Sequence, residues 1–337
     1  MNEDTRPLMV TIQCFTYNQE SYIRQCLEGF VMQKTNFRFE AIVHDDASTD
    51  GTADIVKEYA EKYPDIIKPV FETENQYSKH DGSLERIMDE HTHGKYVAFC
   101  EGDDYWTNPL KLQKQFDRLE KHSECSICFC KVNTINKDER VQKGTIPQNR
   151  ACLPEVVTLN DFIHNEFCLG HWTFHTSSFF IRREIIDKFN NMTHVFRNFP
   201  YGDMPLLLTS LLNGNGMYIN EIMGVYRKES GGYNSFLLSH PEIAIRDQKK
   251  FIQAMYDLDE YTGMKYHNKI KCRILRGEIR IKKLSCDFIG LFDRKYLPIF
   301  KTIGIKGTLS TFLYALSPRF FHYLKLAKTL TFHAKAK

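Results

Sequence analysis

Three groups of polar residues in the first third of the sequence have side chains suited to a metal or phosphate site. They are residues 16–20 (Thr-Tyr-Asn-Gln-Glu), residues 45–50 (Asp-Asp-Ala-Ser-Thr-Asp) and residues 101–104 (Glu-Gly-Asp-Asp). Carboxylates such as those of the third group suit Mg²⁺ or Mn²⁺, which complete their shells with water and phosphate oxygens. Such a cation stabilises the charge that develops on a departing diphosphate. The alternative interpretation of Asp103 and Asp104 is a turn and helix cap before Pro109.

The sequence around these groups alternates between strand and helix patterns. We expect a helix with Ile23 and Leu27 on its apolar face, capped by Asn18, and a second helix containing Val56. The other expected elements are strands at residues 10–15, 39–44, 66–71 and 96–100 and a helix at residues 84–91. This order predicts a parallel sheet with right-handed crossovers, in which ligands bind beyond the carboxyl ends of the strands. We therefore expect the three polar groups to meet at one edge of the sheet.

Composition and motifs exclude several classes of protein. The chain has 337 residues, of which 42% are hydrophobic and 26% charged, so it has ample material for a globular core. Neither G-x-G-x-x-G nor G-x-x-x-x-G-K-[ST] occurs, which disfavours the glycine-rich dinucleotide and P-loop modes. Ten scattered cysteines indicate buried thiols in a reducing compartment, and we favour core positions over a zinc site for Cys125, Cys128 and Cys130.

Charge is distributed unevenly along the chain. Residues 294–337 contain nine basic and no acidic side chains, which leaves 36 basic and 42 acidic residues in 1–293. A mildly acidic globule thus carries a basic end. The sequence shows no signal peptide and no run of 18 apolar residues, so we expect a cytoplasmic protein.

Three motifs in order carry a family resemblance. Residues 15–20, 45–52 and 94–106 together resemble the family 2 glycosyltransferases of bacterial surface-polysaccharide synthesis, such as that of capsule or lipopolysaccharide. The resemblance is clear over about residues 8–135 and weaker over residues 171–235. It implies an α/β GT-A fold, Rossmann-like, with a mixed, mainly parallel sheet flanked by helices. It also implies a nucleotide-diphosphate sugar donor, which we expect to be a UDP-sugar. The reaction would use Mn²⁺ or Mg²⁺ and invert the anomeric carbon.

The resemblance assigns roles on the donor side. Asp46 would accept a hydrogen bond from the base or ribose, and Asp103 and Asp104 match the D-x-D-like element that contacts ribose and metal. Because the local sequence is E-G-D-D, the metal-ligating carboxylate among Glu101, Asp103 and Asp104 stays open. Lys79 would approach the diphosphate, with a solvated loop lysine as the alternative. The nucleoside pocket would be lined by Thr16, Tyr17, Asn18 and Glu20.

On the acceptor side, an inverting transfer needs a base that removes the hydroxyl proton. The resemblance points to Asp203, whose alternative role is the N-cap of the apolar helix that follows. Trp172 and His175, on a strand expected at residues 171–181, would contact a sugar ring or pack in the core. Arg227 would belong to a flap over the diphosphate or to a plain surface loop.

We expect two domains and consider three classes of function. Residues 1–236 form the GT-A domain, with a nucleotide-sugar half at about 8–125 and an acceptor half at about 126–236. Residues 237–337 form a basic, mostly helical extension that lies on the inner face of the membrane or packs as a cap, nucleic-acid binding being a distant third. The leading function is transfer of a sugar to a glycan or lipid-linked glycan. The alternatives are a metal-dependent sugar nucleotidyltransferase and a non-catalytic nucleotide-sugar-binding module.

Overall fold

The computed structural model divides the chain into two compact units. It describes residues 5–79, 81–136, 141–148, 151, 153–192, 196, 198–200, 202–228, 236–237 and 239–317. The first unit comprises residues 1–161, 171–191 and 205–230, and the second comprises residues 162–170, 192–204 and 231–337. The domain boundary between residues 236 and 237 stays a prediction.

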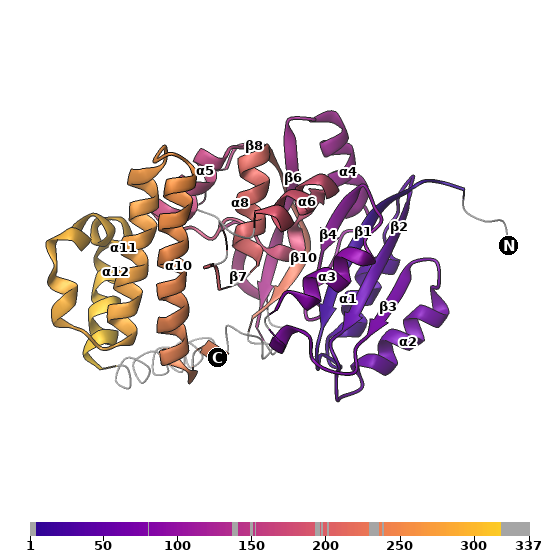
Figure 1. Ribbon diagram of the computed structural model, residues 1–337, viewed down its shortest axis with the longest axis horizontal. Coiled ribbons are helices and arrows are strands. Elements are labelled where there is room, and N and C mark those ends of the chain that lie inside the picture. Colours follow the sequence, from indigo (N-terminus) through magenta and orange to yellow (C-terminus); the bar gives the residue numbers. More distant parts are fainter. Residues whose placement is uncertain are drawn as a thin grey trace, which may run out of the picture. The chain divides into compact units, whose positions relative to one another are not determined.

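The first unit is built on one mixed sheet (Figure 1). Its strands run in the order β3-β2-β1-β4-β9-β6-β10-β5, with β7 beside β6 and β8 beside β10. Neighbours among β1 to β4 are parallel, as are β6 and β10, whereas β5, β7, β8 and β9 pair antiparallel. The strands are β1 (Leu8–Thr16), β2 (Arg38–Asp45), β3 (Ile67–Phe71), β4 (Tyr96–Phe99), β5 (Tyr105–Trp106), β6 (Cys125–Ile135), β7 (Val141–Ile146), β8 (Val156–Val157), β9 (Phe180–Arg182) and β10 (Asn215–Arg227). The predicted GT-A-type sheet and its first four strands are confirmed.

Helices connect these strands, and most of them have one apolar face. The helices are α1 (Ile23–Val31), α2 (Thr52–Lys62), α3 (Ser83–Glu90), α4 (Lys111–Lys121), α5 (Leu159–Ile163), α6 (Arg183–Asn191) and α8 (Asp203–Asn213). The expected cap of the first helix is wrong, because α1 begins after Tyr22 and no side chain caps it. Asn18 instead adopts a positive φ of 52° in the loop before the helix. Asparagine tolerates this conformation because its side chain bonds locally.

The core of the first unit forms where the sheet and these helices bury apolar side chains. Ile12 and Val43 on the strands and Leu27 and Phe30 on α1 are fully buried. Cys125, Cys128 and Cys130 on β6 are buried free thiols, which confirms the expectation of core cysteines. Burial raises the pKa of the Cys130 thiol to about 11, as is usual for an inert structural cysteine.

The strand expected at residues 171–181 is wrong over most of its length. A 3₁₀ turn occupies Thr176–Ser178 and the strand β9 covers only Phe180–Arg182. The turn is stabilised locally, because the amide of Ser177 donates to the ring of His175 and the Ser178 hydroxyl donates to the His175 carbonyl. These side-chain bonds compete with the backbone hydrogen bonds of a strand. They could not be predicted from the aromatic composition of this segment.

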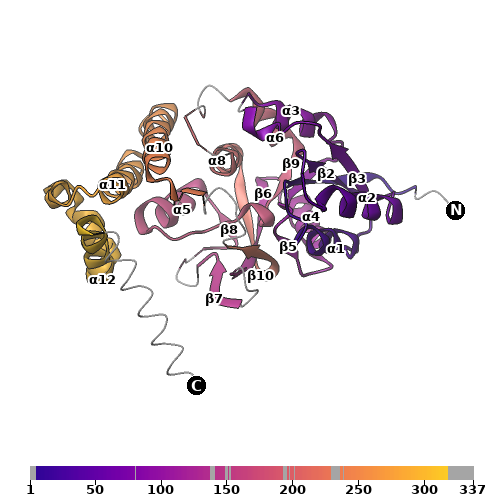
Figure 2. The ribbon, with the colours of Figure 1, turned by 90° about the horizontal axis from the view of Figure 1, so that it is seen from below.

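The long helices of the described part of the second unit are α10 (Pro241–Tyr261), α11 (His267–Leu284) and α12 (Leu297–Leu316), labelled in Figure 2. The helices α10 and α11 pack on each other, and α12 packs on α11. Their helical character agrees with the pattern expected for this part of the chain. Among the described residues, no helix has the length and apolarity needed to cross a bilayer.

One close backbone contact tests the packing of the sheet. A Cβ added at Gly94 would lie 2.5 Å from the Thr11 amide nitrogen and 2.7 Å from the Val10 carbonyl carbon. We expect Gly94→Ala to lower the free energy of unfolding by about 1–3 kcal/mol, because backbone must move to admit the methyl group. Gly202→Ala, with no neighbour within 4 Å of the added Cβ, serves as the control. Equal urea midpoints for the two variants would contradict the described packing.

Candidate active site

Three loops meet at the carboxyl edge of the sheet, as expected from their positions after strands. Thr16 pairs in register with Asp45, so β1 and β2 end side by side. The chain leaving β4 follows the other side of β1, because the amide of Cys100 donates to the Gln13 carbonyl and that of Gly102 to the Phe15 carbonyl. The polar groups at residues 16–20, 45–50 and 101–104 are therefore neighbours.

The first two loops are held together by side chains of the predicted nucleoside pocket. The Asn18 side-chain oxygen accepts the Thr49 amide at 2.8 Å, and the Asn18 amide donates to the Ser48 hydroxyl at 2.9 Å. The Glu20 carboxylate accepts the Gly51 amide at 3.1 Å. These bonds give Asn18 and Glu20 a bracing function in this structure, and their contact with a nucleoside stays a prediction.

The other two residues of that pocket differ in exposure. The Thr16 hydroxyl is buried and donates to the Gln19 side-chain oxygen at 2.8 Å. Tyr17 is 48% exposed, so its ring is available at the surface of the loop. Of the four predicted pocket residues, Tyr17 is thus the one with a free aromatic face for a flat ligand.

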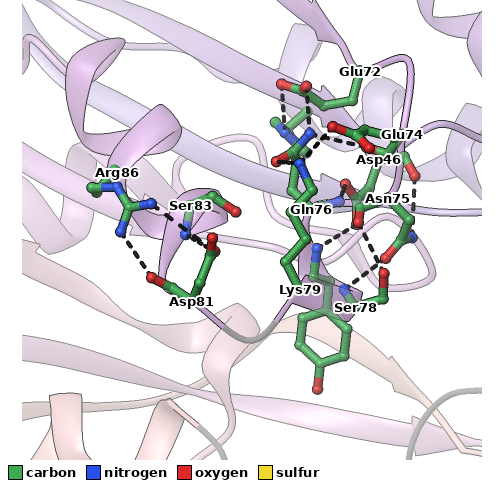
Figure 3. Close-up of polar contacts among 12 residues, drawn as sticks. Asp46, Glu72, Glu74, Asn75, Gln76, Ser78, Lys79, Asp81, Ser83 and Arg86 are labelled. Carbon is green, nitrogen blue, oxygen red and sulfur yellow. Dashed lines mark hydrogen bonds and ion pairs between the residues drawn. The ribbon is translucent and has the colours of Figure 1, made fainter.

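Asp46 shapes the loop that follows β3 (Figure 3). Its buried carboxylate accepts the amide of Gln76 at 2.6 Å and that of Tyr77 at 3.1 Å, one on each oxygen. The Asn75 side-chain amide donates to the Asp46 carbonyl at 3.2 Å. Each carboxylate oxygen can accept a second hydrogen bond, so the predicted contact with a base or ribose is compatible with this arrangement.

Lys79 lies on the same loop and is paired within it. Its ammonium is 2.7 Å from a Glu74 carboxylate oxygen and 3.0 Å from the Gln76 side-chain oxygen. The hydrogen bond with Glu74 raises the pKa of Lys79 above its ordinary value. A diphosphate contact by Lys79 would have to compete with this exposed ion pair, which is worth little in water.

Asp104 is the most deeply buried carboxyl of the acidic turn. It is 1% exposed, and one oxygen accepts the Arg227 amide at 2.9 Å. The other oxygen has no hydrogen-bond partner among the described residues and lies 3.5 Å from the His175 Nδ1. Burial, with the charges of Asp103 and Glu101, raises the pKa of Asp104 well above its ordinary value. Asp103 is half-buried and Glu101 is exposed, so the turn presents carboxyls at three depths.

Arg227 holds the acidic turn from the end of β10. Its guanidinium is 2% exposed, donates from Nε to the Asp103 carbonyl at 2.9 Å and also bonds the Gln25 side chain of α1. The rings of Tyr22 and Tyr105 lie 4.8 Å and 5.2 Å from its Cζ atom. The predicted contact with diphosphate stays a prediction. In this structure Arg227 joins α1, the acidic turn and β10, a function that sequence reasoning missed because Gln25 and Tyr22 belong to no motif.

Trp172 and His175, the predicted acceptor residues, form an aromatic cluster with Tyr226. The His175 ring lies 4.0 Å from that of Tyr226, and the Trp172 ring lies 5.5 Å from it. His175 is buried and Trp172 is partly exposed. Burial, with a smaller effect of Lys228, lowers the pKa of His175 to about 3. Burial thus disfavours the charged form of both His175 and Asp104, whose side chains are in contact.

Asp203 is the first residue of α8, and its carboxylate accepts the amide of Met204 at 2.7 Å. The side chain is exposed, yet surrounding protein disfavours the charged form and raises the pKa of Asp203 above its ordinary value. A carboxyl with a raised pKa and an exposed oxygen has the properties of a general base. The bond goes to the amide of the adjacent residue, whereas an N-cap bonds an amide two or three residues further on, so the capping role stays a prediction.

The acidic turn contains carboxylates of the kind that bind a divalent cation. Among the described residues, no group of three or more His, Cys, Asp and Glu side chains is arranged to hold a metal. The buried Asp104 oxygen without a hydrogen-bond partner, next to Asp103, nevertheless fits a cation that takes one or two carboxylates from the protein. The residues therefore fit Mg²⁺ or Mn²⁺ completed by phosphate and water, and do not fit an all-protein metal cage.

Comparisons with known proteins identify the family. The sequence pattern of "Glycosyl transferase family 2" matches residues 12–189, more than half of the chain, and the chain belongs to this family. This family consists of glycosyltransferases, and the fold of the chain is of the GT-A type.

Individual relatives cover only part of the chain. An uncharacterised protein of Mycobacterium tuberculosis is 44% identical over 129 residues, which are 38% of this chain and 36% of that protein. The putative teichuronic acid biosynthesis glycosyltransferase TuaG of Bacillus subtilis is 31% identical over 159 residues, 47% of this chain and 58% of TuaG. The matches thus span less than two thirds of these curated relatives.

Two solved structures share the fold. The S. aureus TarS fragment 1–349 in complex with UDP-GlcNAc is similar with a TM-score of 0.52 and 18% identity, over 90% of each chain. The mannosyltransferase PcManGT of Pyrobaculum calidifontis, in complex with GDP-Man and Mn²⁺, has a TM-score of 0.52 and 15% identity, over 96% of this chain and 87% of that chain. At these identities the likeness concerns the fold.

The neutral state of His175 predicts a pH effect on stability. The unfolded imidazole binds a proton near pH 6.5 and the folded one only near pH 3, so stability from this group is complete above pH 6.5 and is lost as the pH falls. Between pH 7 and pH 5 we expect the wild type to lose about 2 kcal/mol relative to His175→Gln, from the linkage relation. Urea unfolding of both proteins at the two pH values measures this difference. An unchanged difference would contradict the burial of a neutral imidazole.

Proposed function

We propose that this protein is an inverting glycosyltransferase that moves a sugar from a nucleotide-diphosphate sugar to a glycan or lipid-linked glycan acceptor. The observation that carries the proposal is the acidic turn of Asp103 and Asp104, placed where three strand ends meet and held by Arg227. A negatively charged turn at this edge suits a diphosphate only if a cation lies between them. Family membership supplies the reaction class.

For the donor we propose a UDP-sugar. TarS was solved with UDP-GlcNAc and shares the fold, which supports this choice, whereas PcManGT was solved with GDP-Man. A binding screen of the purified protein with Mn²⁺ against UDP-, GDP- and dTDP-sugars decides between the bases. Tightest binding of a GDP- or dTDP-sugar would refute the UDP proposal and leave the reaction class intact.

For the cofactor we propose Mn²⁺ or Mg²⁺, held by Asp103 and Asp104 together with the donor diphosphate. When bound, the cation supplies positive charge for the departing diphosphate. The protein's part is to hold the carboxylates in place. The Arg227 amide donates to the Asp104 carboxylate, and the Arg227 guanidinium donates to the Asp103 carbonyl. The turn therefore needs little rearrangement to bind the donor.

Removing one of these carboxylates tests the metal proposal. We expect Asp104→Asn to lower metal-dependent turnover by about 10² or more, because the amide keeps the shape and loses the charge. Asp117→Asn, at an exposed position of α4, is the matched control and should keep wild-type turnover. Titration of Mn²⁺ at saturating donor gives the metal dependence of each protein. Full activity of the wild type in EDTA would disprove the cation requirement.

For the general base we propose Asp203. Its carboxylate removes the acceptor hydroxyl proton while the hydroxyl oxygen forms a bond to the anomeric carbon and the bond from that carbon to the diphosphate oxygen breaks on the opposite face. The sugar is therefore inverted, and the proton ends on Asp203. The raised pKa of Asp203 suits this task, because a stronger base accepts the proton more readily.

Replacement of the proposed base should affect turnover without affecting donor binding. We expect Asp203→Asn to lower kcat by about 10² or more with an unchanged donor dissociation constant, because proton removal belongs to the transition state. In the wild type, kcat should fall at acidic pH as the carboxyl becomes protonated, and the variant should lose this dependence. Asp187→Asn, at an exposed position of α6, is the matched control.

Two outcomes would reassign Asp203. Unchanged turnover in a folded Asp203→Asn protein would move the base to another residue. Loss of activity together with a lower unfolding temperature would favour the capping role, in which the carboxylate stabilises the start of α8.

On the acceptor side we propose that Trp172 and His175 contact a sugar ring of a glycan, presented on the cytosolic face of a membrane when it is lipid-linked. The partly exposed Trp172 ring supports this assignment. TuaG, by its name a teichuronic acid biosynthesis protein, supports a surface polysaccharide as the product. Product detection separates this function from the alternatives: a transferase releases UDP, a nucleotidyltransferase releases pyrophosphate, and a binding module releases neither.

A further inference from the structure

The last described helix is apolar on all sides, and yet half of its residues are exposed. α12 has 20 residues, with two lysines and no acidic side chain, and only Ile299 and Ala315 are fully buried. The helix α10 of the same unit instead buries a regular face of eight residues. A helix that is hydrophobic all round is normally covered, either by protein or by lipid. The described part of the second unit covers only a narrow strip of α12.

The exposed apolar side chains of α12 continue onto the turn that precedes it. Ile289 is 83% exposed and Ile305 is 80% exposed. We define the α12 surface by the large apolar side chains of this region that are exposed: Ile289, Phe292, Leu297, Ile305, Leu309, Leu313 and Leu316. Leu297, Ile305 and Leu309 line one groove, and exposed apolar surface of this kind marks an interaction site.

The geometry of α12 suits a helix that lies along a membrane surface better than one that crosses the membrane. Gly304 interrupts the helix with φ 69° and ψ 177°, and an open groove at the kink is lined by side chains that include Phe300 and Leu309. The kink separates two short helical segments, neither of which could span the hydrocarbon thickness of a bilayer. Lys301 and Lys306 flank the kink and are both exposed.

The charge around this surface identifies the kind of partner. Arg294, Lys301 and Lys306 are exposed, and the sequence has no acidic residue from position 294 to the end. Asp287 and Asp293 lie near Ile289 and Phe292, but the lysines beside the kink have no acidic neighbour in α12, so a second copy would bring basic α12 against basic α12. An anionic bilayer offers both an apolar layer and negative headgroups.

We propose that the α12 surface binds an anionic lipid bilayer, with its apolar side chains among the acyl chains and Lys301 and Lys306 at the headgroups. The biological role of this binding rests on the proposed function, because it would bring the transferase to a lipid-linked acceptor. The binding itself requires neither donor nor acceptor. Long lysine side chains reach the headgroup layer while their stems lie on apolar surface.

Vesicle flotation of the full chain tests the proposal. We expect the wild type to bind vesicles of phosphatidylglycerol and phosphatidylethanolamine at low salt and to bind phosphatidylcholine vesicles at least about tenfold more weakly. The double variant Ile305→Glu, Leu309→Glu should lose at least about tenfold in affinity, because two inserted side chains become charged. Lys301→Gln should lose about fivefold, the effect of one surface charge.

A matched control separates insertion from a general effect of added charge. Tyr256→Glu places a glutamate at an exposed apolar position of α10, outside the α12 surface, and should bind the anionic vesicles within about twofold of the wild type. Because all of the substituted positions are exposed, unfolding temperatures should stay equal. Absence of wild-type binding, or equal binding by the double variant, would overturn the proposal. So would a dimer that the double variant abolishes while vesicle binding is absent.

Donor hydrolysis without vesicles keeps this result apart from the proposed function. The double variant should hydrolyse a nucleotide-sugar at the rate of the wild type, since the α12 surface contains none of the proposed site residues. Loss of vesicle binding with normal hydrolysis supports the proposal. Normal vesicle binding by a protein that releases no nucleoside diphosphate from any of the tested nucleotide-sugars would refute the proposed function and leave the membrane surface in place.

Discussion

The candidate site depends on one buried contact, the hydrogen bond from the Arg227 amide to the Asp104 carboxyl. It joins the end of β10 to the turn after β4, two segments 123 residues apart in the chain. The Arg227 side chain extends the junction to α1 through Gln25. Together with the bond from the Gly102 amide to the Phe15 carbonyl, these contacts hold the carboxylates of the acidic turn in place. Burial therefore supplies the rigidity that a preorganised site needs.

That rigidity has an electrostatic cost. Asp104 lies where its charge is disfavoured by burial and by Asp103 and Glu101, and its neighbour His175 is held neutral by burial. The charged carboxylate becomes favourable again only when positive charge is brought close to it. The proposed cation would supply such a charge and offset the cost of burying an acidic group in this turn.

The two units meet different physical demands. In the first, loops are braced by pairs such as Asn18 with Thr49 and Asp46 with Gln76, and little large apolar surface is exposed. In the second, α12 exposes apolar side chains among lysines. A nucleotide is recognised by fixed polar groups, whereas a bilayer is recognised by apolar area and diffuse charge. The contrast agrees with the proposed lipid-linked acceptor.

The sequence by itself determined the alternating strands and helices, the polar groups after three strands and the basic, apolar C-terminal region, because each of these depends on local periodicity or composition. It did not reveal that Asn18 braces a loop, that residues 176–178 form a turn, or that Arg227 contacts Asp103 and Gln25. It also left open which carboxyl of the acidic turn is buried. Only the tertiary structure decided these points, since each depends on which distant segment packs against the residue and excludes water from it.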